Sequence, residues 1–466
     1  MPRLSAAATL AAVALLATSA PAAELAERLQ AALASPGCRG ARVGALVVDA
    51  ASGAEIFAHD ADTPLTPASN MKILTALAAL AAFGPAHQFT TAVSSDRPLD
   101  GDGGVGTLAV RGGGDPALTS EEMWRLAADL QRRGLRRVRG GLLLDDSYFD
   151  GERWNPAWGT PSARAYHAPV AALTTNYGAF SVEVAPPPRS GQPAHVSIDP
   201  PVPFFELSSG VRVGGDAPLS VDRESDGDRE RVRVGGSIRA GGETVAIQRS
   251  VGDPVHYAGA VLRMQLAALG IAVDGPDRVG PVPPGYVRLV EYQGQPLHDV
   301  VALMMKWSNN NIAEMLVKNL GVQATAAPGS WPSGVAAVRA QLSALGVDQN
   351  GLTMVDGSGL AVADRVTPRT LVSALRAARN AFAFGPEFAA ALPIAGRDGT
   401  LKKRAASATD RARAKTGMID GVASLSGYAR TADGRDVVFS ILNNGAPAGD
   451  AAAVAANDAF VEALVQ

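Results

Sequence analysis

Residues 66–75 of the chain read Thr-Pro-Ala-Ser-Asn-Met-Lys-Ile-Leu-Thr, and this stretch decides the fold. Leu74 and Leu77 continue it at helical spacing, which predicts a largely apolar, buried helix. Ser69 and Lys72 are three residues apart, so on a helix their side chains lie on one face. A serine hydroxyl becomes a good nucleophile when a neighbouring base takes its proton, and a desolvated lysine with a lowered pKa is such a base. We therefore predict that Ser69 attacks a carbonyl carbon and that Lys72 activates it.

A Ser-x-x-Lys pattern alone is weak evidence, because a serine near a helix start usually only caps the helix. The lysine content of the chain strengthens the prediction. Of the 42 Lys and Arg residues, only six are lysines, at positions 72, 306, 318, 402, 403 and 415. A guanidinium effectively never loses its proton, whereas an ammonium can, so arginine cannot replace lysine as a base. A lysine inside a buried helix of this arginine-rich chain therefore favours a role for Lys72 as a base.

Composition bounds the class of protein. A chain of 466 residues exceeds one ordinary core, so two or three domains are expected. A hydrophobic content of 47% with 19% charged residues is typical of a folded protein. The net charge of -3 gives no reason to expect nucleic acid as a partner. Six scattered histidines and one cysteine form no metal-ligand pattern, so neither a metal nor another cofactor is predicted.

The N-terminus resembles a secretion signal. Arg3 precedes an apolar segment around residues 10–16, and Ala-Pro-Ala at 20–22 fits a small-x-small cleavage site. The apolar run is too short to span a bilayer, and no later stretch qualifies as a transmembrane anchor. We therefore predict a signal peptide at 1–22 and an exported mature chain, with the single Cys38 as a small buried residue.

The order of predicted elements indicates a discontinuous domain. Apolar strands at 43–49 and 55–59 precede the Ser69 helix, which favours an α/β or α+β layer. From about 89 to 287 the chain is rich in Gly, Pro and β-branched residues, with helices predicted at 121–134 and 256–270. Within it, 189–242 is either a nested module or an exposed hairpin region. From 288 onward helix and strand signals resume, ending in a hairpin with its turn at 432–434 and a helix at 451–464.

Two further short motifs follow the first. Ser308-x-Asn310 alone would usually be a helix cap, and Lys415-Thr416-Gly417 alone would be a turn before a strand. Their joint presence, in this order after Ser-x-x-Lys, is typical of penicillin-binding proteins and related serine β-lactamases.

Each of these residues suits a chemical task in acyl transfer. Ser308 can relay a proton to a leaving amine, and Asn310 can orient a substrate amide. Lys415 supplies a positive charge and Thr416 a hydroxyl for a terminal carboxylate, while Gly417 lets another backbone or a ligand approach closely.

The long spacing between the first two motifs separates the members of this superfamily. The chain resembles the class C low-molecular-mass penicillin-binding proteins, which carry a large insertion after the first motif. The resemblance covers nearly all of the mature chain and includes, besides the three motifs, residues 114–116 (Gly-Asp-Pro), 168–169 (Ala-Pro), 313–314 (Ala-Glu), 356–360 (Asp-Gly-Ser-Gly-Leu), 398–401 (Asp-Gly-Thr-Leu) and 425–428 (Leu-Ser-Gly-Tyr). It implies a transpeptidase-like α/β (α+β) domain, an antiparallel sheet flanked by helices, formed by 23–88 and 288–466. The mostly-β residues 89–287 would be inserted into it.

The resemblance also implies an activity. Such proteins are periplasmic serine peptidases that cleave D-Ala-D-Ala ends, and often D-amino-acid cross-links, of peptidoglycan stem peptides, and β-lactams acylate their serine. The oxyanion hole would be the backbone N–H groups of Ser69 and Met418. Met418 stands where Thr or Ser is common, so we expect altered β-lactam or substrate affinity with catalysis retained.

Two other functions stay open at this point. A β-lactamase or esterase would use the same serine with faster hydrolysis of the acyl-enzyme. The chain shows no obvious deacylating glutamate, since Glu314 on the helix after the second motif is expected to face solvent or cap neighbours. A non-catalytic wall-binding or sensor protein would retain the fold only, and the chemically competent motif side chains argue against it.

Overall fold

The computed structural model describes residues 24–466. The predicted signal peptide at 1–22 lies outside the described residues. The chain divides into two compact units. The first unit holds the described chain up to Ala81 together with Val301–Ser308 and Arg339–Gln466, and the second holds Ala82–Val300 and Asn309–Val338. The domain boundaries at 88/89 and 287/288 stay predictions.

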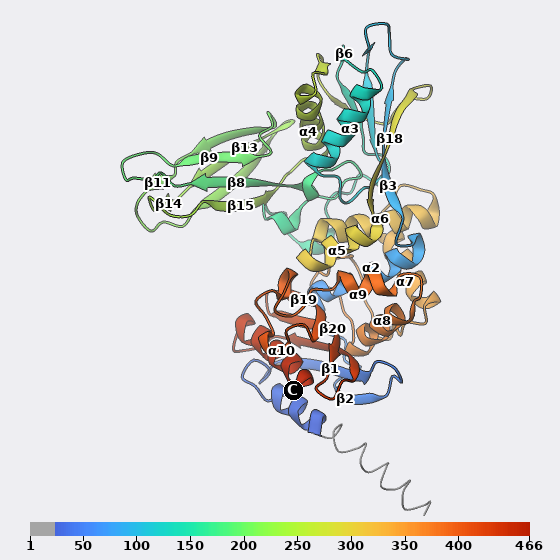
Figure 1. Ribbon diagram of the computed structural model, residues 1–466, viewed down its shortest axis with the longest axis vertical. Coiled ribbons are helices and arrows are strands. Elements are labelled where there is room, and N and C mark those ends of the chain that lie inside the picture. Colours follow the sequence, from blue (N-terminus) through green and yellow to red (C-terminus); the bar gives the residue numbers. More distant parts are fainter. Residues whose placement is uncertain (1–23) are drawn as a thin grey trace, which may run out of the picture. The chain divides into compact units, whose positions relative to one another are not determined.

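The first unit is built on a five-stranded antiparallel sheet in the order β19-β20-β21-β1-β2 (Figure 1). Two segments that lie far apart in the sequence meet inside this sheet, because β1 pairs with β21 and Gly44 lies opposite Leu442. β19 forms one edge, and among residues 24–466 its outer side pairs with no other strand and makes only an isolated bridge between Arg413 and Ile394. The strand bounds are Arg42–Asp49 for β1, Glu55–His59 for β2, Ala412–Ile419 for β19, Val422–Arg430 for β20 and Asp436–Asn444 for β21.

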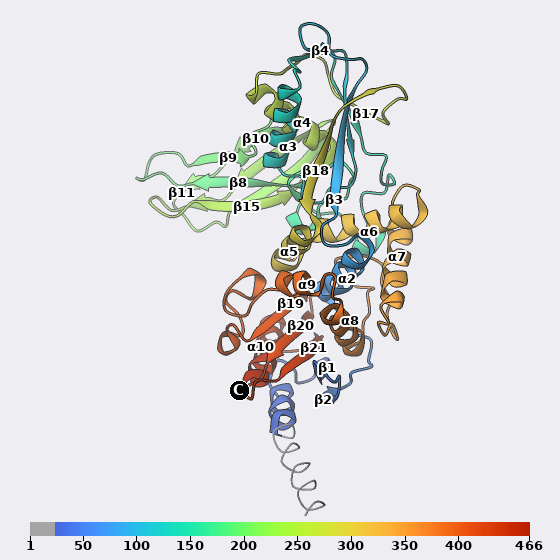
Figure 2. The same ribbon diagram turned by 45° about the vertical axis from the view of Figure 1, so that its right-hand side comes forward.

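Helices cover both faces of this sheet (Figures 1 and 2). Val43, Ala45 and Val47 of β1 share a hydrophobic core with α10 (Asp450–Val465) and with the helical residues 24–33. On the other face, a Cβ at Gly44 would lie 2.9 Å from the side chain of Pro368, the first residue of α8 (Pro368–Asn380). Side chains alternate between the faces of a strand, so a strand covered on both faces is apolar throughout, as predicted.

Four other helices complete or join the units. α9 (Gly385–Ala391) belongs to the first unit. α2 (Met71–Phe83), α5 (Leu297–Trp307) and α7 (Trp331–Ala344) each contribute residues to both units. The predicted helix after Ser69, the hairpin turn at 432–434 and the terminal helix are confirmed.

The second unit contains a mixed five-stranded sheet in the order β17-β7-β5-β3-β18. β18, β3 and β5 pair antiparallel, whereas β5, β7 and β17 pair parallel. Helices α3 (Ser120–Arg132) and α4 (Pro254–Ala268) pack against each other, and their apolar residues share one core with β5 and β7. The strand bounds are Gln88–Ser95 for β3, Leu108–Gly112 for β5, Leu142–Asp145 for β7, Arg278–Val279 for β17 and Val287–Pro296 for β18.

Four smaller sheets complete the second unit, together with α6 (Asn310–Thr325). Their orders are β15-β8-β9, β10-β13-β12, β11-β14 and β16-β6-β4. The bounds are Gly104–Val105 (β4), Arg137–Val138 (β6), Ala179–Ala185 (β8), His195–Asp199 (β9), Phe205–Ser209 (β10), Arg212–Val213 (β11), Ser220–Asp226 (β12), Arg229–Gly235 (β13), Ser237–Ile238 (β14), Val245–Ser250 (β15) and Ala272–Val273 (β16).

The charged stretch within 189–242 forms the hairpin of β12 and β13. Along β13, Glu230, Val232 and Val234 are buried while the arginines between them are exposed, which is the alternation of a half-buried strand. Its status as a nested module stays a prediction. Within residues 24–466, none of the helices combines the length and apolar character needed to cross a bilayer.

Candidate active site

Ser69 lies in the 3-10 turn Ala68–Asn70 that opens α2, and Lys72 lies in the first turn of α2 itself. Side chains three residues apart lie on one face in a 3-10 turn and in an α-helix alike, which brings the two together. The Lys72 Nζ donates a hydrogen bond of 3.0 Å to the Ser69 Oγ. Lys72 is fully buried, whereas Ser69 is partly exposed, so the hydroxyl is open to a substrate while the amine is shielded from water.

The loop at 356–361 holds Lys72 from the other side. The carbonyl of Ser358 accepts a 2.8 Å hydrogen bond from the Lys72 Nζ, and the carbonyl of Gly357 accepts one from the Thr75 hydroxyl. The buried Asp356 carboxylate fixes the loop by accepting the backbone N–H groups of Gly359 and Ala361. The sequence motif at 356–360 therefore has a structural task beside the nucleophile.

Ser308 and Lys415 form the second contact of the site. The Lys415 Nζ donates to the Ser308 Oγ at 2.9 Å and to the carbonyl of Thr416 at 2.7 Å. Ser308 has a positive φ of 58°, and so does Ala68, next to Ser69, at 46°. Such conformations cost roughly 1 kcal/mol or more for a residue with a side chain, and they persist where the surrounding structure imposes them. Ser308 itself and the residue next to Ser69 are both held in this way.

Burial shapes the charge of Lys415. Its side chain has no exposed surface, and burial lowers the pKa of this lysine well below its ordinary value. The positive charges of Lys72 and Arg404 lower the same pKa further. A carboxylate placed beside Lys415 would favour its charged form, so the site is electrostatically suited to an anionic ligand.

Gly417 lies where the edge strand β19 passes the nucleophile. A Cβ at this position would lie 2.9 Å from the backbone nitrogen of Ser69 and 2.8 Å from the carbonyl oxygen of Pro67, and it would also meet the Ser424 hydroxyl. That hydroxyl donates a 2.6 Å hydrogen bond to the Pro67 carbonyl, so this backbone segment is anchored to β20. The backbone that was predicted to come close to Gly417 is therefore that of the turn at Ser69.

Gly417→Ala is expected to lower the rate at which Ser69 is acylated by about 100-fold, because displacing a reacting group by about 1 Å has effects of this size. The rate with a fluorescent penicillin measures this. Gly101→Ala is the matched control, since a Cβ at Gly101 meets no atom within 4 Å. An unchanged rate in Gly417→Ala would contradict the close packing of β19 against the Ser69 turn.

The backbone of β19 presents N–H groups at the open edge of the sheet. The Ala414 N–H donates to the Pro393 carbonyl, which lies outside the sheet, at 2.9 Å. N–H groups alternate in direction along a regular strand, and the pairing of β19 with β20 has no register shift from 412 to 419. The N–H groups of Thr416 and Met418 therefore point to the same open edge. The Met418 side chain is 64% exposed.

The residue between Ser308 and Asn310 caps the helix that follows the second motif. The Asn309 side chain accepts a 3.0 Å hydrogen bond from the Ile312 N–H and caps α6. Asn310, the first residue of α6, belongs to the second unit, where its Nδ2 donates to the Tyr166 carbonyl at 2.9 Å. The other predicted site residues, Ser69, Lys72, Ser308, Lys415, Thr416, Gly417 and Met418, all belong to the first unit.

Several supporting contacts were not predicted from the sequence. The Lys306 Nζ, at the end of α5, donates to the Leu392 carbonyl and to the Asp398 carboxylate, which fixes the chain just before Ser308. The Thr416 hydroxyl donates to the Thr400 hydroxyl at 2.7 Å. Two sequence features pointed to these residues, namely the scarcity of lysine and the motif at 398–401.

Glu314 was wrongly expected to face solvent or to cap its neighbours. It is fully buried in the second unit and accepts a 2.8 Å hydrogen bond from the indole N–H of Trp331. The buried indole N–H on α7 offsets the cost of burying the carboxylate. The residue pattern of one helix does not reveal a partner that lies on another helix.

Comparisons with known proteins bear on this geometry. The model of the family described as D-Ala-D-Ala carboxypeptidase 3 (S13) matches residues 25–466. A D-alanyl-D-alanine carboxypeptidase from Actinomadura sp. is 37% identical over 441 residues, which cover 91% of this chain and 81% of the relative. The D-alanyl-D-alanine carboxypeptidase DacB of Haemophilus influenzae is 28% identical over 418 residues, covering 88% of this chain and 87% of the relative.

Two solved structures superpose on this chain along most of its length. The crystal structure of penicillin binding protein 4 (dacB) from Haemophilus influenzae superposes with a TM-score of 0.80 at 26% identity, covering 93% of this chain and 97% of the other. The same protein complexed with a novel β-lactam superposes with a TM-score of 0.75 at 26% identity, covering 94% and 99%.

These matches confirm the predicted class C penicillin-binding-protein resemblance, the fold and the assignment as a serine peptidase. They extend along almost the whole described chain, across both units. The chain belongs to the D-Ala-D-Ala carboxypeptidase 3 (S13) family.

Proposed function

We propose that Ser69 is the nucleophile of a DD-peptidase reaction and that Lys72 is its base. The observation that carries this proposal is the 3.0 Å hydrogen bond between the Lys72 Nζ and the Oγ of Ser69, a residue that is partly exposed. The Oγ forms a bond to the carbonyl carbon between the two D-Ala residues, its proton passes to Lys72, and the C–N bond breaks. Water then hydrolyses the ester and restores Ser69.

Ser308 completes the proton path. The amine that leaves must gain a proton, and a hydroxyl can donate its own proton while accepting another. The Ser308 Oγ already accepts a hydrogen bond from the Lys415 Nζ, so it is polarised for this relay. Asn310 orients the substrate amide, as the position of an amide side chain two residues after Ser308 suggests.

Lys415 and Thr416 bind the terminal carboxylate of the substrate. Lys415 has a pKa well below its ordinary value, so binding of a carboxylate would be accompanied by a gain of positive charge on its amine. Thr416 adds a hydroxyl on the same strand. Discrimination in favour of substrates with a free C-terminal carboxylate follows from this arrangement.

The N–H groups of Ser69 and Met418 stabilise the oxyanion. The Ser69 backbone nitrogen lies against Gly417 of β19. The N–H of the next residue in this strand, Met418, points to the open edge of the sheet. Two donors aimed at the carbonyl oxygen stabilise the charge that develops there, and each is worth about 10²-fold or more in rate.

The proposed substrates are peptidoglycan stem peptides, cleaved at D-Ala-D-Ala ends and at D-amino-acid cross-links. The names of the two curated relatives and the peptide chemistry of the site support the first of these. Acylation by β-lactams is proposed because the Haemophilus protein has been crystallised with one. A periplasmic location follows from the predicted signal peptide at 1–22.

A peptide that ends in D-Ala-D-Ala and a cross-linked muropeptide dimer test this function. We expect free D-Ala from the first and monomers from the second, and no cleavage of the matched peptide that ends in L-Ala. Free D-Ala and the muropeptides are measured by chromatography coupled to mass spectrometry. Binding without turnover would support a wall sensor, whereas hydrolysis of β-lactams without release of D-Ala would support a β-lactamase.

A further inference from the structure

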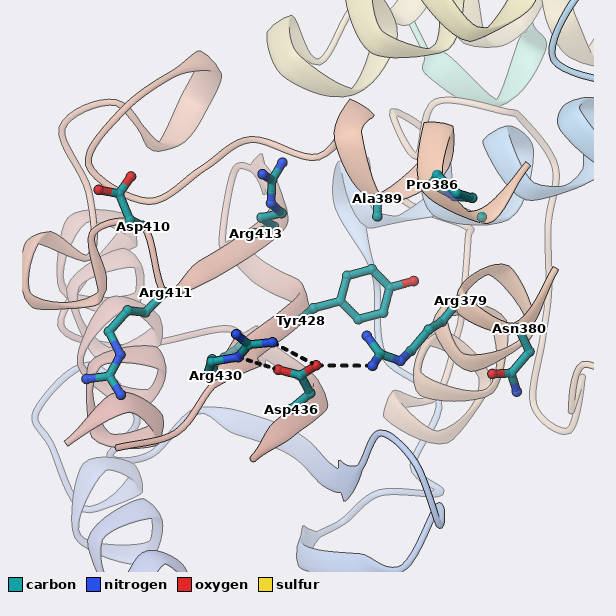
Figure 3. A pocket seen from close by; sticks show the side chains of 12 residues that line it. Arg379, Asn380, Pro386, Ala389, Asp410, Arg411, Arg413, Tyr428, Arg430 and Asp436 are labelled. Carbon is teal, nitrogen blue, oxygen red and sulfur yellow. Dashed lines mark hydrogen bonds and ion pairs between the residues drawn. The ribbon is translucent and has the colours of Figure 1, made fainter. Parts of the chain in front are cut away.

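The first unit has a cavity of about 580 Å³ whose lining includes none of the proposed catalytic residues. Figure 3 shows that its walls come from the end of α8, from α9, and from β19, β20 and β21. The charged residues of the lining are four arginines and two aspartates, namely Arg379, Arg411, Arg413, Arg430, Asp410 and Asp436.

Both aspartates are already neutralised. Asp436 accepts hydrogen bonds from Arg430 and from Arg379, as the dashed lines in Figure 3 show. Asp410 is paired with Arg397, which lies outside the lining. The cavity therefore has an excess of positive charge, and both Arg379 and Arg430 keep a large exposed surface, 41% and 64% of their side chains.

Two arginines of the cavity carry charge without a carboxylate beside it. Arg411 donates to the carbonyls of Val465 and Thr431. The exposed Arg413 side chain has no hydrogen-bond or ion-pair partner among residues 24–466. Arg413 lies in β19 and Arg411 directly precedes it, and Figure 3 shows their side chains pointing in opposite directions. A planar guanidinium matches the oxygen geometry of a phosphate.

An exposed aromatic residue lies in the segment between two parts of this lining. Asn380 at the end of α8 and Gly385 at the start of α9 both line the cavity, and the four residues between them are Ala-Phe-Ala-Phe. Phe382, within this segment, is 99% exposed, while Phe384 is buried. A fully exposed aromatic ring in an uncharged loop is able to insert into the apolar phase of a membrane that lies beside the cavity.

We propose that this surface docks onto an anionic phospholipid membrane, with phosphate headgroups in the arginine-lined cavity and Phe382 inserted among the acyl chains. Basic side chains that face phosphates, together with an inserted aromatic residue, are the two contributions that hold peripheral proteins at a bilayer surface. The docking is reversible and weakens as the salt concentration rises.

Sedimentation of the mature full chain with vesicles tests the proposal. We expect binding to phosphatidylcholine vesicles that contain phosphatidylglycerol and little binding to pure phosphatidylcholine. Arg413→Glu and Phe382→Ser are each expected to weaken binding about tenfold. Arg278→Glu is the matched control, since Arg278 is exposed on β17 in the second unit, and it should bind as the wild type does.

A labelled variant reports insertion directly. Phe382→Cys with a polarity-sensitive dye should shift its emission to shorter wavelength on phosphatidylglycerol vesicles only, and the native Cys38 is buried and does not compete for the dye. Cleavage of a soluble peptide verifies that each variant is folded. The proposal is overturned if vesicles are not bound, or if both substitutions leave binding unchanged. It is also overturned if inorganic phosphate binds at Arg413 while Phe382→Ser has no effect, which would indicate a site for a soluble anion.

Discussion

Ser69→Ala is expected to abolish the covalent adduct that wild-type protein forms with a fluorescent penicillin. The Ser69 hydroxyl is the proposed nucleophile, so its removal should lower peptidase turnover by about 10⁴-fold or more. Intact-protein mass spectrometry measures the adduct, with one drug per chain in the wild type. Thermal unfolding of the variant establishes that the fold is retained.

Ser407→Ala is the matched control for this experiment, because Ser407 is an exposed serine of the same unit. Its adduct should have the wild-type yield. An adduct that survives Ser69→Ala would place the nucleophile elsewhere. A wild-type chain that leaves the drug intact and unbound would contradict the proposed function, and one that hydrolyses the drug without a lasting adduct would point to a β-lactamase.

Lys72→Arg is expected to slow acylation of Ser69 by about 10³-fold, the usual size of a lost general base. Arginine keeps the positive charge and the hydrogen-bonding capacity, but its guanidinium cannot accept the serine proton at any ordinary pH. Lys72 is fully buried, so Lys72→Met serves as a second variant with a smaller side chain. The second-order rate constant for acylation measures both.

The same Lys→Arg exchange at an exposed lysine is the control, because it leaves the proposed base Lys72 in place. Lys402→Arg, in the segment before β19, should acylate at the wild-type rate. If Lys72→Arg stayed within tenfold of the wild type while remaining folded, Lys72 would be a positioning residue and another group would have to take the proton.

Local spacing was enough to predict the first half of the site. Ser69 and Lys72 are neighbours along one turn, so their contact depends on residues that are close in sequence. The strand pairs around 51–53 and 432–434 were predictable for the same reason, because short turns join them.

The second half depends on contacts between distant segments. Nothing near Ser308 in the sequence indicates that its hydroxyl accepts from Lys415, or that the Ser358 carbonyl accepts from Lys72. Periodicity describes one element at a time, and these partners come from different elements. The error at Glu314 has the same origin, since its partner Trp331 lies on another helix.

The pairing of β1 with β21 has a consequence for how the protein is made. Gly44 and Leu442 are neighbours in the sheet but are separated by roughly 400 residues of chain. The central strands can therefore close only after nearly the whole polypeptide has been synthesised, and contacts of such long range form slowly. A truncation after β20 would spare every motif residue and still leave β1 without its partner. We therefore expect that such a truncated chain is not labelled by penicillin, so labelling would also report that β1 has paired with β21.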